Sequence, residues 1–435
     1  MHFPPYILQV PDHPQVSKTL LFSLLNGKAI VVPSDFLEKM RSNFLHDTHH
    51  LPLDIIKLNF LRENFLVEDE LDGKRKIAEA IYKTIHSRDK AALSVLTTTD
   101  CNMACPYCHE GLRKQKNYMS YEMAQRIAKF CVRDFISNET RELWIYFYGG
   151  EPLLNVGAIE MFLSSLQIEL RIANLCPSII LEMSTNGILL TRSLACLLKK
   201  IGLSSVQITL DGPPEIHDKR RITGNGEGTF ATILRNIQEI LDILNITIRI
   251  NIDRQNLHSA ANVLTTLSQM DLLTHLRVYA DFVTNTFENP AHCREFVIKD
   301  LEDKKGIVDV WRQFRLHGVK LFGLRFTEGM CGNLGSNSLV VDPEGKIYNC
   351  IGFVGQSDHA VSDIEHFKAA RTNFSFRNCK PYLACLDCPY VPVCGGGCRV
   401  QAFIETGDIT GRSCNRAFYD YAYPEFLRMR FPPKT

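Results

Sequence analysis

The chain has 435 residues, of which 45% are hydrophobic and 22% are charged, a balance typical of a folded globular protein. Its 49 Lys and Arg residues nearly balance its 48 Asp and Glu residues. The net charge of +1 therefore does not indicate binding to nucleic acid or to an anionic membrane. We find no apolar run as long as a membrane span and no secretory signal at the N-terminus. We therefore expect a cytoplasmic protein of two to three domains.

The first 90 residues predict a small α+β domain. A short strand at 5–10 precedes two apolar runs around Asn26-Gly27, a dipeptide typical of a hairpin turn. A helix capped by Ser34 or Asp35 follows, then a second helix, a strand at 65–69 and a helix at 74–86. This mixture suggests a winged-helix-like domain.

Residues 91–315 predict a second domain, in which apolar β-rich runs alternate with helical patterns. The expected strands are 92–99, 143–149, 179–186, 205–212, 246–253 and 276–283, and the expected helices are 120–136, 156–170, 191–201, 229–244 and 259–270. Six such units predict an α/β fold with a partial (β/α)6 TIM-like barrel. In barrels the chemistry lies at the C-terminal ends of the strands, and each distinctive motif directly follows one of these runs.

Fifteen cysteines are an unusual number for a chain that can bury its own core without disulfides. Eight of them lie in residues 316–435, seven of these in a spaced pattern that leaves out Cys379. Loops and glycines dominate there, and we expect a third, loop-rich domain held partly by metal. Three others, Cys131, Cys176 and Cys196, lie in or beside helical patterns and are expected to be buried small apolar residues.

The first barrel strand is followed by Cys101, Cys105 and Cys108 in a C-x3-C-x2-C spacing. Three thiolates from one loop can hold three irons of a [4Fe–4S] cluster and leave the fourth iron open. Zinc is the alternative, but a structural zinc needs four ligands, and the adjacent His109 is poorly placed to be the fourth. The spacing therefore favours an iron–sulfur cluster.

This motif, with Tyr107 before its last cysteine, resembles that of the radical S-adenosylmethionine (SAM) superfamily. Three further motifs match the family: residues 149–152 (GGEP) after the second strand, 184–187 (STNG) after the third, and 209–213 (TLDGP) after the fourth, continuing to Arg220 and Arg221. The resemblance covers residues 92–285. By contrast, Gly224, Gly226 and Gly228 predict only a turn before the next helix.

The resemblance implies a role for each matched position. SAM would chelate the open iron, and its reductive cleavage would give a 5′-deoxyadenosyl radical. Gly149 and Gly150 would let backbone approach the methionine amino group, which a side chain would block. The family's remaining SAM contacts fall on Arg221 at the carboxylate (with Arg220 as its competitor), Thr209 through its hydroxyl, Asn186 near the ribose, Tyr107 near the adenine, and Glu151 at the amino group or as a residue that orients the loop.

The C-terminal cysteines resemble the seven-cysteine pattern of the SPASM extension, found on radical SAM enzymes that modify peptides and proteins. The match covers residues 325–418 and implies two auxiliary iron–sulfur clusters, expected in the [4Fe–4S] form. One would be held by Cys385, Cys388, Cys394 and Cys414, and the other by Cys331, Cys350 and Cys398. The second set is one ligand short, because Arg325 stands where some members have a cysteine. Either an iron stays open, or Cys379 or Cys293 completes the site.

Two substrate classes follow from the resemblance. Anaerobic sulfatase maturases oxidise a Cys or Ser to formylglycine and carry an Asp base at the position of Ile351, so its absence argues against that chemistry. Maturases of ribosomally made peptides instead begin with a winged-helix-like domain that docks a leader peptide. We favour a cross-link (carbon–carbon, ether or thioether) in such a precursor over epimerisation, because two auxiliary clusters offer a route for the second electron.

Other expectations concern partners and proton transfer. The resemblance implies an electron donor such as flavodoxin or ferredoxin, besides the leader-plus-core precursor peptide. His109 and Glu110 are the candidates for proton transfer beside the cluster loop, and a loop-surface role is the alternative. An iron–sulfur scaffold that binds peptide without turnover is the non-enzymatic alternative, which the intact motif set disfavours.

Overall fold

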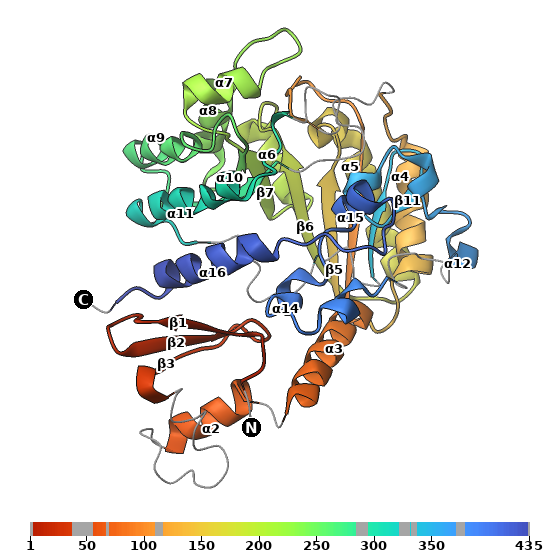
Figure 1. The fold of residues 1–435 in the computed structure, drawn as a ribbon. Helices are drawn as coiled ribbons and strands as arrows, with labels where there is room; N and C mark the ends of the chain where they lie inside the picture. Colours follow the sequence, from red (N-terminus) through yellow and green to blue (C-terminus); the bar gives the residue numbers. More distant parts are fainter. Residues whose placement is uncertain are drawn as a thin grey trace. The chain divides into compact units, whose positions relative to one another are not determined.

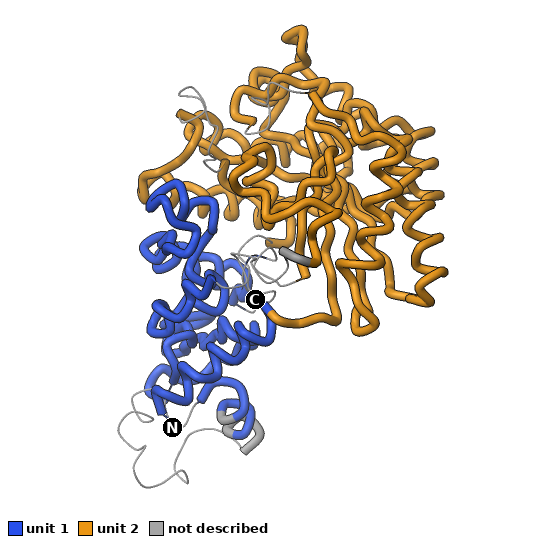
Figure 2. Tube along the Cα trace, turned by 90° about the vertical axis from the view of Figure 1, so that its right-hand side faces the viewer, with its two compact units in different colours: residues 1–85, 324–332, 379–435 blue, residues 86–323, 333–378 orange. Residues whose placement is uncertain are grey.

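The structure is a computed structural model, and it describes residues 3–36, 55–66, 69–108, 116–283, 295–321, 331, 337–370 and 379–433. Its contacts divide the chain into two compact units, coloured separately in Figure 2. One unit contains residues 86–323 and 333–378, called the barrel unit below. The other contains residues 1–85, 324–332 and 379–435, called the terminal unit. The expected division into 1–90, 91–315 and 316–435 rests on sequence motifs and stays an expectation.

The barrel unit is built on six consecutive parallel strands, labelled in part in Figure 1. They are β4 (Lys90–Leu96), β5 (Glu142–Tyr148), β6 (Ser178–Thr185), β7 (Ser205–Thr209), β8 (Asn245–Ile252) and β9 (Leu276–Phe282). Each pairs with the next in register, for example Ser94 with Tyr146 and Ile208 with Ile248. All six runs predicted as strands are therefore confirmed, and the architecture is that of a partial α/β barrel.

Helices connect these strands as the alternating pattern predicted. They are α4 (Tyr121–Phe130) with η1 (Cys131–Phe135), η2 (Pro152–Asn155), α5 (Val156–Ile172), α6 (Arg192–Lys200), α7 (Pro214–Arg220), α8 (Phe230–Ile240), η3 (Ala260–Asn262) and α9 (Val263–Gln269). The Ser120 hydroxyl caps α4 by accepting from the N–H of Met123. Among the described residues, the stretch Pro152–Ile172 is long and apolar enough to cross a membrane. It connects β5 to β6 and buries Ile159, Phe162 and Leu166, as a core helix does.

Three strands and two helices of the barrel unit were not predicted. β10 (Ser338–Val341) pairs in parallel with β4, and β11 (Lys346–Tyr348) and β12 (Ser362–Asp363) follow it antiparallel. The described sheet thus has nine strands, in the order β12-β11-β10-β4-β5-β6-β7-β8-β9. The additional helices are α10 (Leu301–Lys305) and α11 (Ile307–Leu316), and the short turns η6 (Ile351–Phe353), η7 (Ser357–His359) and α12 (Phe367–Ala370) surround the added strands.

The terminal unit begins with a three-stranded antiparallel sheet of β1 (Ile7–Pro11), β2 (Lys18–Ser23) and β3 (Ala29–Pro33). The hairpin prediction is confirmed: Gly27 has φ +69°, and its N–H donates to the carbonyl of Ser23. α2 (Ile55–Asn64) and α3 (Glu70–His86) follow. The predicted strand at 65–69 is wrong for its described residues, since Phe65 and Leu66 are buried in a turn after α2 rather than paired in a sheet.

The C-terminal part of this unit is made of short helices: η9 (Pro381–Cys385), α14 (Val391–Cys394), α15 (Arg399–Thr406) and α16 (Arg416–Arg430). α16 contacts β1. At its end, the carbonyl of Phe431 accepts from the His13 ring at 2.6 Å, and the Phe431 ring lies 6.1 Å from that of Phe22. The two ends of the chain therefore share one hydrophobic core, which the sequence pattern did not indicate.

The lone cysteines differ from one another. Cys131 is buried in η1 as expected, and burial raises the pKa of its thiol to about 12. Cys176 and Cys196 are exposed, so the expectation that they are buried is wrong. Cys196 lies on the outer face of α6, whose buried positions are Ala195 and Leu198.

Candidate functional site

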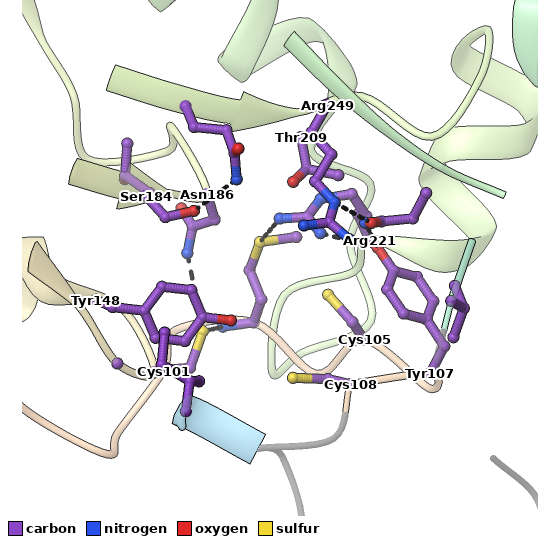
Figure 3. Close-up of a pocket in the computed structure, with 18 of the residues that line it drawn as sticks. Cys101, Cys105, Tyr107, Cys108, Tyr148, Ser184, Asn186, Thr209, Arg221 and Arg249 are labelled. Atoms are coloured by element: carbon purple, nitrogen blue, oxygen red, sulfur yellow. Dashed lines mark hydrogen bonds between the residues drawn. The ribbon is translucent and has the colours of Figure 1, made fainter. Parts of the chain in front are cut away.

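A cavity of about 340 Å³ lies at the carboxyl ends of the barrel strands, within the size range of small-molecule sites (Figure 3). Residues from β5 to β9 and from the cysteine loop line it. They are Cys101, Met103, Cys105, Tyr107, Cys108, Tyr146, Tyr148, Gly149, Gly150, Ser184, Thr185, Asn186, Gln207, Thr209, Arg221, Arg249, Asn251, Phe282, Val283 and Ile351. Nearly every residue that the motifs singled out is therefore brought to one place.

The loop after β4 presents the three cysteines to this cavity, and Figure 3 shows their sulfur atoms facing a shared space. The Asp100 carboxylate accepts from the N–H of Cys101, and the N–H of Ala104 donates to the carbonyl of Ile222, which anchors the loop from both sides. Burial raises the pKa of the Cys101 thiol to about 11 and raises that of Cys105 as well. Such thiols ionise readily only when a cation binds them.

The described residues contain no group of three Cys, His, Asp or Glu side chains arranged for a single metal ion. Cys101, Cys105 and Cys108 all line the one cavity, and three thiolates from one loop can each bind a different iron of a cluster.

Gly149 and Gly150 are required by the close approach of two loops. A Cβ on Gly149 would lie 2.2 Å from the carbonyl oxygen of Thr98, and a Cβ on Gly150 would lie 2.0 Å from that of Asp100. The N–H groups of Gly150 and Glu151 donate to these same two carbonyls. Packing against the cysteine loop is thus one physical reason for these glycines, and the expected approach of their backbone to a ligand stays a prediction.

Glu151 does not line the cavity but lies behind it, fully buried. Its carboxylate accepts from the N–H of Asn186 and the hydroxyl of Thr185, both at 2.7 Å, and from the N–H of Leu153 at 3.1 Å. Burial raises the pKa of this carboxyl, and the hydrogen bonds oppose the shift. Glu151 thus connects two strand ends, which matches the alternative that it orients the loop.

Arg221 reaches the cavity from the end of α7 with its donors only partly satisfied. One Nη donates to the hydroxyl of Tyr107 at 2.9 Å, the other contacts the Met103 sulfur at 3.8 Å, and Nε is buried without a partner. The described residues place no carboxylate within ion-pair distance of it. Desolvation lowers the pKa of Arg221, but Tyr107, Cys105 and Asp211 nearby raise it well above its usual value. The site therefore offers an unpaired cation to an anionic ligand.

Arg220, the competitor of Arg221, points elsewhere. It forms an ion pair of 2.6 Å with Asp253 and lies 3.7 Å from Asp211, and its guanidinium stacks 4.7 Å from the centre of the Tyr107 ring. The charge of Arg220 is thus balanced inside the protein. The Tyr107 hydroxyl also donates to Asp211, so this tyrosine is held by the network beneath the cavity.

Residues of the barrel interior were missed by the motif analysis. Gln207 donates to Ser184 and accepts from Tyr279, and Nε of Arg249 donates to Asn251 at 2.8 Å. These side chains occupy alternate positions on their strands, opposite to the buried Val, Ile and Leu residues that face the helices. A polar alternation within otherwise apolar barrel strands was therefore the available signal. Thr209 lies at the end of the same row.

Several expected site residues lie outside the described part of the chain: His109, Glu110, Cys293 and Arg325. Ile351 is described and lines the cavity. An apolar side chain thus occupies the wall at the position where sulfatase maturases would carry their base.

The C-terminal cysteines of the terminal unit interact in two groups. The thiols of Cys388 and Cys394 interact electrostatically with one another and with Cys385 and Cys414, and desolvation raises the pKa of both. Cys398 interacts with Cys331 instead. Cys350 belongs to the barrel unit. The four-cysteine set therefore lies together, as expected for one cluster.

Three consecutive glycines form the turn between Cys394 and Cys398. Gly395, Gly396 and Gly397 all have positive φ, and a Cβ on Gly397 would lie 2.0 Å from the carbonyl oxygen of Ser413. This loop could not approach the chain before Cys414 with larger residues.

Comparisons with known proteins agree with this geometry. The family model of the radical SAM superfamily matches residues 95–266. The chain is 23% identical over 384 residues to the radical SAM cyclopropyl synthase TigE of Paramaledivibacter caminithermalis, covering 79% of this chain and 76% of that protein. It is 24% identical over 378 residues to the cysteine-type anaerobic sulfatase-maturating enzyme of Clostridium perfringens, covering 77% and 94%.

Two solved structures share the fold. The native anSMEcpe structure with bound AdoMet and Cp18Cys peptide has a TM-score of 0.61 at 20% identity and covers 78% of this chain and 98% of that one. The Streptococcus suis SuiB structure bound to precursor peptide SuiA has a TM-score of 0.54 at 14% identity and covers 95% and 99%. The radical SAM family model thus covers the segment that contains the cysteine loop and Arg221, and the chain is similar to this superfamily there. The similarity implies a [4Fe–4S] cluster that binds SAM, and the two solved structures share the fold over most of the chain.

Proposed function

We propose that the chain is a radical SAM enzyme that modifies a ribosomally made precursor peptide, by installing an intramolecular carbon–carbon, ether or thioether cross-link. The observation that carries the proposal is the convergence of Cys101, Cys105 and Cys108 with the unpaired guanidinium of Arg221 on one cavity. The radical chemistry and the choice of substrate rest on separate arguments.

The residues of the cavity fit a cluster and SAM. Cys101, Cys105 and Cys108 would hold three irons, and SAM bound to the fourth would supply a 5′-deoxyadenosyl radical on reduction. Arg221, whose Nε has no protein partner, would bind the SAM carboxylate. Glu151 holds the strand end that carries Asn186, and the glycine loop packs against the cysteine loop. Tyr107 and Thr209, which line the cavity, would contact the adenosyl group.

Support for a peptide substrate comes from the relatives. The anSMEcpe and SuiB structures both contain a bound peptide. The SuiB match leaves about 5% of this chain uncovered, fewer residues than the N-terminal 85, so the shared fold extends into the N-terminal sheet. We infer that this sheet and its helices form a winged-helix-like module that docks a leader peptide.

The edge of that sheet suits strand addition. β3 is an edge strand of the described sheet, whereas β1, at the other edge, is contacted by α16. The N–H of Ser34 donates to Ser17, and the carbonyl of Lys28 accepts from Ser23, so the even-numbered residues of β3 face β2. The N–H of Val31 therefore points away from the sheet, available to an added strand.

The cavity wall bears on the reaction type. Ile351 cannot accept a proton, which disfavours formylglycine formation, the second candidate supported by the similarity to the sulfatase-maturating enzyme. Two auxiliary clusters in the C-terminal cysteine sets would accept the second electron of an oxidative cross-link, whereas an epimerisation returns a hydrogen atom. Such clusters and free thiols require a reducing compartment, the cytoplasm, and a donor such as flavodoxin or ferredoxin.

The test is anaerobic turnover with the precursor peptide encoded beside the gene. A cross-link removes two hydrogen atoms from the peptide and forms 5′-deoxyadenosine, and mass spectrometry detects both products. A peptide of unchanged mass that has exchanged hydrogen with solvent would instead indicate epimerisation. Conversion of a sulfatase-derived Cys or Ser peptide to formylglycine would establish the second candidate.

A further inference from the structure

Arg399 directly follows Cys398 and is 3% exposed, one of the few buried cations of the terminal unit. Every nitrogen of its guanidinium has a partner. Four backbone carbonyls accept from it: Gly396 at 2.7 Å, Gly397 at 2.9 Å, Ile409 at 2.8 Å and Gly411 at 2.6 Å.

These carbonyls belong to two loops that carry the expected ligands. Residues 395–397 connect Cys394 to Cys398, and residues 409–411 lead to Cys414. One side chain therefore fastens the loops on which three expected ligands sit. A planar guanidinium with five donors can span four carbonyls, which an ammonium with three donors cannot do.

The charge of Arg399 is not balanced by a carboxylate. In the part of the chain that the structure describes, no Asp or Glu lies within ion-pair distance of it, and the nearest acid named among its interactions, Asp408, is exposed. Burying a charge is costly unless an opposite charge accompanies it. An iron–sulfur cluster held by thiolates is anionic, and the neighbouring Cys398 places such a group beside the guanidinium.

Cys379 takes part in the same arrangement. Its buried thiol donates to the carbonyl of Ile409 at 3.2 Å and accepts from Arg399 at 3.6 Å. The charged groups that act on this thiol are Arg399 and Asp408, and no cysteine is among them. The Cys379 thiol thus packs against the loop that contains Ile409 and does not interact with the other cysteines named here.

We propose that Arg399 is a positioning residue for the auxiliary cluster that Cys398 helps to hold. It fastens the two ligand loops and supplies the positive charge that balances the cluster. Because reduction adds negative charge, this cation raises the reduction potential of that cluster and prepares it to accept an electron from the substrate. Cys379 belongs to this arrangement and is not a ligand. The inference rests on the proposed function, since it presupposes auxiliary clusters.

The test uses the full chain, reconstituted anaerobically, as Arg399→Met, Arg399→Lys and Arg412→Met. Arg412 is the matched control, because it lies in the same region but is exposed, with one long bond to the carbonyl of Ala384. Iron per chain and an EPR-monitored redox titration are measured. We expect Arg399→Met to move the midpoint of one auxiliary cluster to a more negative potential, with Arg399→Lys and Arg412→Met close to wild type.

Wild-type iron content and unchanged potentials in Arg399→Met would overturn the proposal. If that variant loses about four irons, Arg399→Lys separates the two roles: retained iron supports the role of the charge, and equal loss supports the fastening of the loops and contradicts the role of the charge. Cys379→Ala should keep all its iron, and loss of about four irons would show that Cys379 is a ligand. Wild-type protein that cleaves SAM but holds no auxiliary iron would instead refute the cluster assignment in the proposed function.

Discussion

Among the residues that the structure describes, the barrel unit and the terminal unit each contain a buried arginine with no carboxylate within ion-pair distance, and the two side chains differ in their hydrogen bonds. Arg399 uses every guanidinium nitrogen on the chain's own atoms, mostly backbone carbonyls. Arg221 makes one strong bond, to Tyr107, and leaves Nε without a partner. Arg220 also leaves Nε and one Nη without a hydrogen-bond partner, so a missing bond indicates a ligand site only where, as for Arg221, the side chain lines the cavity and forms no ion pair.

Arg220 shows what a structural arginine looks like in the same protein. It is as deeply buried as Arg399, but Asp253 and Asp211 balance its charge. Ion pairs with carboxylates therefore distinguish Arg220 from Arg221 and Arg399. For these two, the proposals above supply an anionic ligand or cluster.

The largest expected effect separates the two cysteine regions. Replacing Cys101, Cys105 and Cys108 together by Ala should abolish SAM cleavage and remove about four irons, while about eight remain in the C-terminal region. Iron analysis and chromatography of 5′-deoxyadenosine measure this. An unchanged iron content would mean that the first cysteine loop holds no cluster.

The second prediction compares Arg221 with Arg220. Arg221→Met should weaken SAM binding by about 2–5 kcal/mol, roughly 30-fold or more in Kd, because the SAM carboxylate loses its charged partner. Arg220→Met should instead lower the melting temperature, since it leaves Asp253 and Asp211 buried without a counter-charge. Calorimetry with SAM and thermal unfolding measure the pair. Equal losses of SAM affinity in the two variants would remove the distinction between them.

The third prediction concerns pH. The Cys101 pKa in the folded, iron-free chain is about 11, against an ordinary value of 9.0, so the folded state holds this proton more tightly than the unfolded state. At pH 8 its thiolate fraction, and hence its alkylation rate, should be roughly 100-fold lower than in urea-unfolded protein. The same difference makes folding stability fall as pH rises above 9.0. Mass-spectrometric alkylation kinetics test it, and equal folded and unfolded rates would contradict it.

The smallest expected effect lies in the N-terminal sheet. Deleting this sheet is a poor test, because α16 contacts β1 and His13 bonds to Phe431. Val31→Pro removes an outward N–H without disturbing the pairing with β2, and should weaken precursor binding about tenfold. Val31→Thr keeps the N–H and serves as the control. Fluorescence anisotropy of a labelled leader measures affinity, and wild-type binding by Val31→Pro would exclude this edge.

The barrel could be predicted because its pattern is local. Each of the six strands is a β-rich and largely apolar run, and each motif follows a strand directly, which was enough to bring Asn186, Thr209 and Arg221 to one cavity. β10 to β12 have only two to four residues each. β10 pairs with β4 across more than 240 positions, and β11 and β12 pair in turn beside it, so no local periodicity indicates them.

Other features depend on contacts that a single sequence does not contain. The reason for Gly150 is the carbonyl of Asp100, which only folding brings near. Arg399 looks like an ordinary residue after a cysteine until the loops close around it. Arg249 and Asn251 could have been found from the polar alternation within β8, a signal that needs only the strand assignment.

The most direct test of the central claim is single-turnover cleavage of SAM by the anaerobically reconstituted wild-type chain with a low-potential reductant. We predict formation of 5′-deoxyadenosine and methionine in equal amounts, with the amount of 5′-deoxyadenosine rising when precursor peptide is present. A protein that carries the barrel cluster and binds SAM but forms no 5′-deoxyadenosine would contradict the account.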